Sequence, residues 1–208
     1  MPKIKSPYTA SITGGGFLYE ETLRLLPLLQ SEDREALLKD EKLHNRVLQI
    51  NAETSRIRII VEISRRFAVM PNSFWTDFLA MSPADQQVAL FLVILKTYKI
   101  LFDFHIEVTL RKWKSIDKTV GPDDLMLEFN EVAARDPFVD SWKEATRKKI
   151  TSSYLTILRK IGLIDSDNNL QPLHCSNFDY YLTHRESWFL EACLLQPYEI
   201  DNIKNSLS

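Results

Sequence analysis

Residues 83–101 read PADQQVALFLVILKTYKIL. Pro83 occupies the position that proline favours at the start of a helix, and Ser82 precedes it as an N-cap. Every residue from Val88 to Leu95 is apolar. A helix that is hydrophobic nearly all round must be buried, so we expect this helix to form the centre of a helical core.

The same stretch is too short to cross a membrane. A span needs roughly 20 consecutive apolar residues, and Lys96 and Lys99 interrupt this one. No signal peptide is apparent at the N-terminus, so we expect a cytoplasmic protein without a membrane span. Cys175 and Cys193 are then expected to be free thiols in a reducing compartment.

Composition places the chain among folded helical proteins. Of the 208 residues, 45% are hydrophobic and only five are glycine, which argues against a sandwich, a barrel or a disordered chain. The recurrent helical periodicity predicts an all-α, multi-helix globular protein with two helix-turn-helix elements. We expect an N-terminal helical region over 1–118, with a helix-turn-helix around 43–70. A C-terminal helical region over 119–208 would carry a winged-helix-like element around 141–173, and the two regions would pack as one globule.

The second element depends on residues 146–165, which read TRKKITSSYLTILRKIGLID. Between Thr146 and Gly162 there are five Lys or Arg residues and no acid. With successive residues 100° apart, one side of the helix is apolar and the other is basic and hydroxylic. The candidate DNA-binding residues here are Arg147, Lys148, Lys149, Ser152, Thr156 and Arg159, with Lys160 at the margin.

This pattern favours a recognition helix followed by a wing. Lysine and arginine neutralise phosphates, and serine and threonine hydroxyls contact phosphates or base edges. Gly162 predicts the helix end, and the Asp/Asn-rich stretch 165–169 predicts the turn of a short hairpin. A solvated basic helix that merely packs on the core is the alternative.

The first element is predicted as a short helix over 43–49, a polar turn, and a helix over 54–70. Its apolar stripe is Ile57, Ile60, Ile63 and Phe67, while Arg56 falls nearer the buried side. The candidate DNA-binding residues on the opposite face are Ser55, Arg58 and Arg65. Glu62 is spaced to pair with Arg58 and Arg66, so an ordinary salt-bridged surface helix remains the alternative.

A third basic cluster surrounds Trp113 and consists of Arg111, Lys112, Lys114 and Lys118. It could brace a DNA backbone. Lysines at a helix end also complement the helix dipole, and we favour that structural role.

Signatures of catalysis and metal binding are missing from the sequence. The four histidines are dispersed, and no nucleophile-elbow, phosphate-loop or dinucleotide motif is present. We therefore expect no catalytic residue, no metal and no cofactor. The formal net charge is −2, so a DNA-binding protein of this composition must concentrate its positive charge on one surface.

Several stretches together resemble the BrxA family, small proteins of bacterial BREX (bacteriophage exclusion) systems. They are YTASITGGG at 8–16 leading into EETLRL at 20–25, Asn45-x-x-Leu48, TSRIR at 54–58, SRRF at 64–67, and the stretch 154–163. The match in size and order covers essentially the whole chain. The resemblance implies an all-helical protein that binds duplex DNA within a phage-defence system that encodes a methyltransferase and other partner proteins. Members have been labelled inner-membrane proteins, which the hydropathy of this chain argues against.

The sequence is compatible with three functions. The first is a non-enzymatic double-stranded DNA-binding protein that uses both helix-turn-helix elements. The second is an all-helical protein–protein adaptor whose basic helices dock on acidic partners. The third is an RNA-binding helical bundle that uses the same basic faces.

Overall fold

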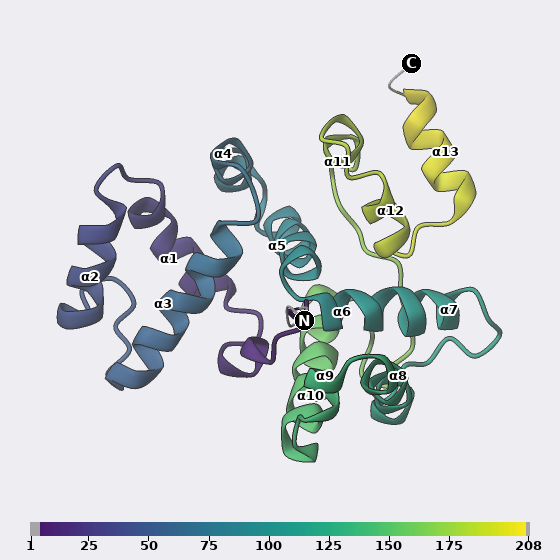
Figure 1. The fold of residues 1–208 in the computed structure, drawn as a ribbon. Coiled ribbons are helices and arrows are strands. Elements are labelled where there is room, and N and C mark those ends of the chain that lie inside the picture. The colour runs from purple at the N-terminus through teal and green to yellow at the C-terminus, as the bar shows by residue number, and fades with distance from the viewer. Residues whose placement is uncertain (1–4, 207–208) are drawn as a thin grey trace. The chain divides into compact units, whose positions relative to one another are not determined.

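The computed structural model describes residues 5–206, and the chain divides into two compact units. The N-terminal unit is Ala10–Thr97, and the C-terminal unit combines residues 5–9 with 98–206. Nearly all regular structure in both units is helical, which confirms the all-α class (Figure 1).

The N-terminal unit is built around its last helix. Its elements are η1 (Ser11–Gly14), α1 (Tyr19–Leu29), α2 (Arg34–His44), α3 (Glu53–Phe67), α4 (Asn72–Ala80) and α5 (Pro83–Thr97). Every residue of α5 from Val88 to Leu95 is at most 3% exposed, as predicted for a central core helix. In the described part of the chain, no helix is both long and apolar enough to cross a membrane.

The connection between α2 and α3 differs from the prediction. No separate helix covers 43–49. Instead α2 runs to His44 and ends at Asn45, whose φ of 52° lies in the left-handed region. The buried carboxylate of Glu41 then accepts hydrogen bonds from the backbone N–H groups of Arg46, Val47 and Leu48, each 2.9 Å long. These bonds hold the connection as a loop, because its amides are satisfied by a side chain rather than by a helical ladder.

Arg56 closes the same loop from α3. Its guanidinium donates to the carbonyl of Lys42 at 2.7 Å and to that of Ile50 at 2.8 Å. Arg56 is buried, which agrees with its predicted place near the apolar side of the helix. Two buried charges of opposite sign, on Glu41 and Arg56, thus stabilise the loop through backbone groups.

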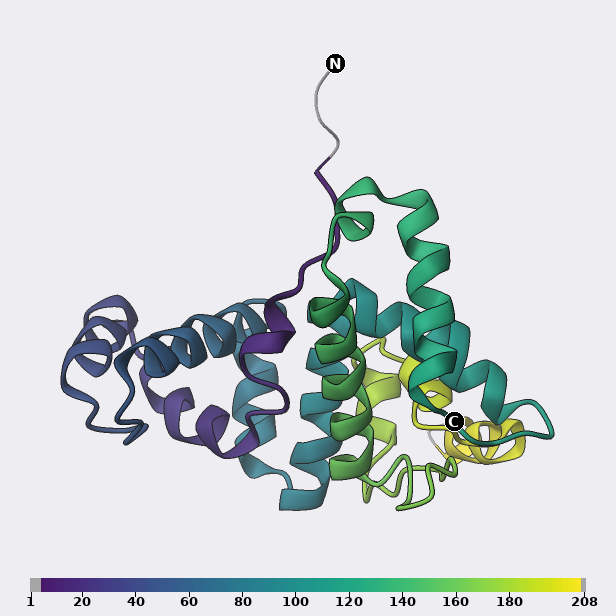
Figure 2. The same ribbon diagram turned by 90° about the horizontal axis from the view of Figure 1, so that it is seen from below.

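The C-terminal unit contains the remaining elements (Figures 1 and 2). They are α6 (Lys99–Asp103), the π-helical segment η2 (Phe104–Thr109), α7 (Leu110–Trp113), α8 (Pro122–Arg135), α9 (Pro137–Asp140), α10 (Glu144–Ile161), α11 (Asp179–Thr183), α12 (Trp188–Ala192) and α13 (Pro197–Ser206). Helix α8 packs against α9, α10 and η2. One continuous helix, α10, occupies the stretch from 144 to 161.

The boundary between the units lies earlier than the predicted one at 118–119. The division falls between Thr97 and Tyr98, and within the C-terminal unit η2 packs on α6, α7 and α8. Residues 5–9 also belong to the C-terminal unit. The hydroxyl of Tyr8 donates to the carboxylate of Asp103 at 2.9 Å, and burial together with this carboxylate raises the pKa of Tyr8 to about 12.

Three short extended segments complete the C-terminal unit. Antiparallel bridges join Ile164 to Leu170 and Thr119 to Asn169. The amide of Gln171 donates to the carbonyl of Leu163 at 2.8 Å, so the chain turns back on itself after α10. The segment that precedes α8 pairs with this hairpin through Thr119 and forms the third extended segment.

A buried polar chain connects α10 to the rest of the C-terminal unit. The Nε2 atom of His105 lies 2.8 Å from the carbonyl of Ala192, so it must be the protonated ring nitrogen. Nδ1 then accepts from the hydroxyl of Tyr154 at 2.9 Å. The Tyr154 oxygen accepts in turn from Thr109 at 2.7 Å. A neutral imidazole satisfies every bond in this chain, and burial lowers the pKa of His105 to about 4.

The buried histidine predicts a loss of stability in mild acid. The unfolded chain binds a proton on His105 near pH 6.5, whereas the folded chain does so only near pH 4. Stability from this group is therefore complete above pH 6.5 and falls by up to about 3 kcal/mol as the pH approaches 4. Urea unfolding across this range measures the decline.

Two variants separate this effect from general acid sensitivity. His105→Gln should flatten the pH dependence between 6.5 and 4, and His44→Gln, at an exposed histidine, should leave it as in the wild type. An unchanged slope in His105→Gln would show that the imidazole titrates normally in the fold.

Candidate nucleic-acid interface

Helix α10 is buried along one side and open along the other. Ile150, Tyr154, Ile157 and Leu158 are fully buried, as predicted from their spacing. The helix ends at Gly162, whose φ of 81° favours glycine over any residue with a Cβ.

The outer face of α10 is the surface formed by its exposed basic and hydroxyl side chains. These are Lys148, Lys149, Ser152, Thr156, Arg159 and Lys160. At 100° per residue they fall within an arc of about 120°. The structure therefore places five of the predicted residues on one accessible surface and adds Lys160, which the sequence placed only at its margin.

The cations of the outer face differ in how they are engaged. Lys148 pairs with Glu144 at 2.6 Å, and this exposed pair raises the pKa of the lysine. The guanidinium of Arg159 donates to the side-chain carbonyl of Asn168 at 2.5 Å, which ties the helix to the hairpin. Among the described residues, neither Lys149 nor Lys160 has an acidic partner. Two positive charges are thus left for an external anion.

Arg147 lies apart from the outer face. Its side chain is 15% exposed, and its guanidinium donates to the backbone carbonyls of Trp142 at 3.2 Å and Asp140 at 2.8 Å. These bonds join α9 to the first turn of α10. Sequence periodicity could not reveal this, because the acceptors are backbone groups in a neighbouring turn.

The outward face predicted for α3 is partly covered within the N-terminal unit. Arg66 is fully buried and donates to the carbonyls of Gly16 at 2.5 Å and Phe17 at 2.7 Å. Glu62 is buried as well, and its carboxylate accepts from Ser11 at 3.4 Å. The N-terminal segment therefore packs on the side of α3 that the sequence left open to solvent.

The predicted DNA-binding residues of α3 sit beside this segment. Arg58 is exposed, and its Cδ lies 2.6 Å from where a side chain on Gly14 would begin. Arg65 lies 4.0 Å from the carboxylate of Glu62, and Ser55 is half-buried. Ile57, assigned to the buried stripe, is 36% exposed instead.

The third basic cluster is paired internally. Arg111 lies 2.6 Å from Glu107, and Lys114 lies 3.3 Å from Glu191. Lys112 contacts two aspartates, and the ammonium of Lys118 sits 4.1 Å from the centre of the Trp113 ring. These contacts agree with the structural role favoured from the sequence.

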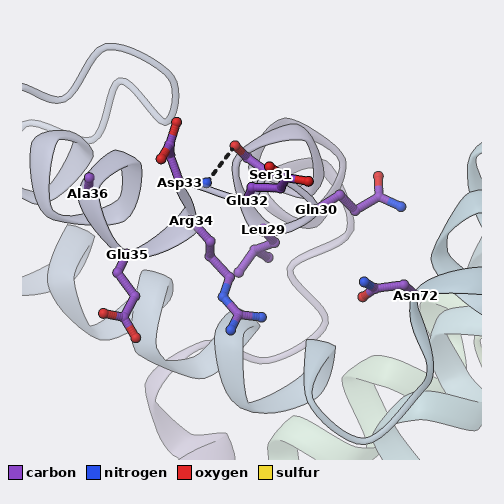
Figure 3. A pocket seen from close by; sticks show the side chains of 9 residues that line it. All are labelled: Leu29, Gln30, Ser31, Glu32, Asp33, Arg34, Glu35, Ala36 and Asn72. Carbon is purple, nitrogen blue, oxygen red and sulfur yellow. Dashed lines mark hydrogen bonds between the residues drawn. The ribbon is translucent and has the colours of Figure 1, made fainter.

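A polar hollow of about 540 Å³ opens where α1 leads into α2 in the N-terminal unit (Figure 3). Its lining includes Glu32, Asp33, Arg34 and Glu35, and Ser31 accepts a hydrogen bond from the backbone N–H of Asp33 at 3.1 Å. Three acidic side chains and one basic side chain line this hollow, as expected for a solvated helix start. Within residues 5–206, no group of three or more His, Cys, Asp or Glu side chains could hold a metal ion.

Among known protein families, the model of the BrxA family matches residues 6–178 of this chain. The chain belongs to the BrxA family. The sequence resemblance is thereby confirmed over most of the chain.

Two known proteins are similar to this BrxA-family chain. The "BREX protein BrxA" of Bacillus cereus (strain H3081.97) is 20% identical over 157 residues, which cover 76% of this chain and 78% of the relative. The crystal structure of an uncharacterized protein from Magnetospirillum magneticum superposes with a TM-score of 0.72 at 22% identity, covering 90% of this chain and 98% of that one. At this identity the second match establishes a shared fold alone.

The contacts of Arg147 predict that it acts in folding. Arg147→Ala should lower the free energy of unfolding by about 1–3 kcal/mol, because it leaves acceptors at the α9–α10 junction without a donor. Lys149→Ala, two residues away on the outer face, should change it by no more than about 0.5 kcal/mol. Urea unfolding of the two variants compares them. Equal changes in the free energy of unfolding would contradict the conclusion that Arg147 supports the fold while Lys149 does not.

Proposed function

We propose that this BrxA-family protein is a non-enzymatic, double-stranded DNA-binding protein whose principal contact is the outer face of α10. The observation that carries the proposal is that Lys149 and Lys160 lie on an exposed helix face and have no acidic partner among residues 5–206. From Ala145 to Ile161 the helix contains no acid. Lysines placed in this way can bind DNA phosphates and release the cations that were condensed on the DNA.

The spacing of these lysines suits a duplex. They are eleven residues apart, which corresponds to about 16 Å along the helix axis. The major groove is about 12 Å wide and admits one α-helix. A helix lying in the groove could therefore direct Lys149 and Lys160 to phosphates near opposite edges, with Ser152 and Thr156 between them.

The order of elements around α10 supports a winged-helix arrangement. An extended segment at Thr119, helix α8, the single turn α9, helix α10 and a hairpin at 164–170 follow one another, and bridges join the three extended segments. Such an arrangement places the helix before the hairpin in the groove. The hairpin itself carries Asp165 and Asp167 and no basic residue. We infer that the helix, and not the hairpin, supplies the phosphate contacts.

Binding of this kind is weakly selective for sequence. The outer face offers lysines and hydroxyls, while Arg159, the residue best suited to a bidentate contact with guanine, is already bonded to Asn168. The element around α3 would provide a second, weaker contact through Ser55, Arg58 and Arg65. The name of the Bacillus cereus relative, "BREX protein BrxA", supports action within a BREX system together with other BREX proteins.

Charge removal from the outer face tests the proposal. For Lys149→Ala with Lys160→Ala, we expect the log–log salt slope of duplex binding to fall by up to about 2, because each lost phosphate contact removes roughly 0.9. Fluorescence anisotropy with a random-sequence duplex at several salt concentrations measures the slope.

The matched control is Arg58→Ala with Arg65→Ala. It removes the same charge from the N-terminal unit and should reduce the slope less, since Glu62 already offsets Arg65. If both double variants bind like the wild type and melt at the same temperature, the proposal fails and a protein–protein adaptor becomes the better function. Equal competition by structured RNA would favour the RNA-binding alternative.

A further inference from the structure

An acidic groove of about 370 Å³ lies between η2–α7 and α8 in the C-terminal unit. Four carboxylates line it, from Glu107, Asp124, Glu128 and Glu131. The two basic residues in its lining are already engaged: Arg111 lies 2.6 Å from Glu107 and Lys112 lies 3.0 Å from Asp124. The groove is therefore a net negative surface on a protein whose proposed DNA contact is positive.

Glu128 is the unusual member of this groove. Its side chain is only 10% exposed, and its Oε1 atom is buried with no hydrogen-bond donor among the described residues. The nearest cation, the guanidinium of Arg135, lies 3.7 Å away, beyond hydrogen-bond distance. Burial, and next the nearby Glu107, raise the pKa of Glu128. A buried carboxylate oxygen without a donor costs stability, and Glu128 also belongs to the lining of the groove, where a partner's donor can reach its carboxylate.

The remaining lining indicates what kind of cation fits. Val108 and the exposed Leu127 add apolar surface beside the carboxylates. Arginine and lysine side chains combine an aliphatic stem with a charged head, and a guanidinium can offer a carboxylate two parallel donors. Within the described residues no cluster is arranged to hold a metal ion, which favours an organic cation.

We propose that this groove docks a basic segment of a partner protein, with an arginine side chain laid over Val108 and Leu127 and its guanidinium bonded to Glu128. The interaction is independent of DNA binding, because it uses side chains of η2, α7 and α8 and none of the outer face of α10. Charge complementarity selects the partner: four acids against two paired bases repel nucleic acid and attract a basic peptide.

The test uses a fluorescein-labelled nine-residue peptide with two arginines separated by a leucine in a Gly/Ser background. The full-length protein should bind it, and Glu128→Gln should weaken binding at least tenfold. Glu20→Gln, at an exposed acid of the N-terminal unit, should leave binding unchanged. The same peptide with glutamates in place of arginines should not bind.

Thermal melting supplies a second readout. Because Gln removes the charge that is buried without a donor, Glu128→Gln should melt at the same temperature as the wild type or about 2–4 °C higher. A lower melting temperature would mean that Glu128 supports the fold, and would overturn the proposal.

Two further outcomes would also overturn it. One is peptide binding that Glu128→Gln does not change. The other is tighter binding of spermidine than of the peptide, which would assign the groove to a polyamine. Duplex binding measured on the same Glu128→Gln variant should match the wild type, so failure here and failure of the proposed DNA contact are distinguishable.

Discussion

The orientation of α10 depends on one buried tyrosine. The hydroxyl of Tyr154 would be left without partners in an apolar core, and His105 and Thr109 provide them. His105 is anchored in turn to the carbonyl of Ala192 in α12. Since a rotation of α10 would break these bonds at a substantial cost, the network determines which side of the helix meets solvent. The exposed lysines follow from that choice.

Sequence periodicity predicted the elements whose environment is set by apolar spacing. The burial of α5 follows from its continuous apolar run, and the two sides of α10 follow from Ile150, Tyr154, Ile157 and Leu158. Glycine at 162 ended α10 where expected, because few other residues adopt its backbone conformation readily.

Sequence periodicity could not predict the long-range polar contacts. Glu41 and Arg56 replaced an expected short helix with a loop, and Arg66 turned inward to carbonyls about fifty residues away. Arg147 was assigned to DNA from its charge, although backbone acceptors around α9 hold it. In each case a charged side chain satisfies main-chain groups that only the tertiary structure brings near. Charge alone therefore overestimates how many basic residues are available to a ligand.

The C-terminal unit separates surfaces of opposite charge. Beyond Glu144 in its first turn, α10 carries no acid beside its basic side chains, whereas the groove between η2–α7 and α8 has more acids than its two paired bases can neutralise. A near-neutral chain can in this way present one surface to a polyanion and another to a polycation. Such a division suits a protein that brings DNA and a protein partner together.

Photocrosslinking tests most directly whether α10 contacts DNA. A benzophenone amino acid placed at Ser152, in the middle of the outer face, should crosslink to a labelled 20-base-pair duplex in a salt-sensitive manner. The same group placed at Leu127, beside the acidic groove, should not. Crosslinking that is equal from both positions, or absent from Ser152 while the protein still binds the duplex, would contradict the assignment of α10 as the DNA-contacting helix.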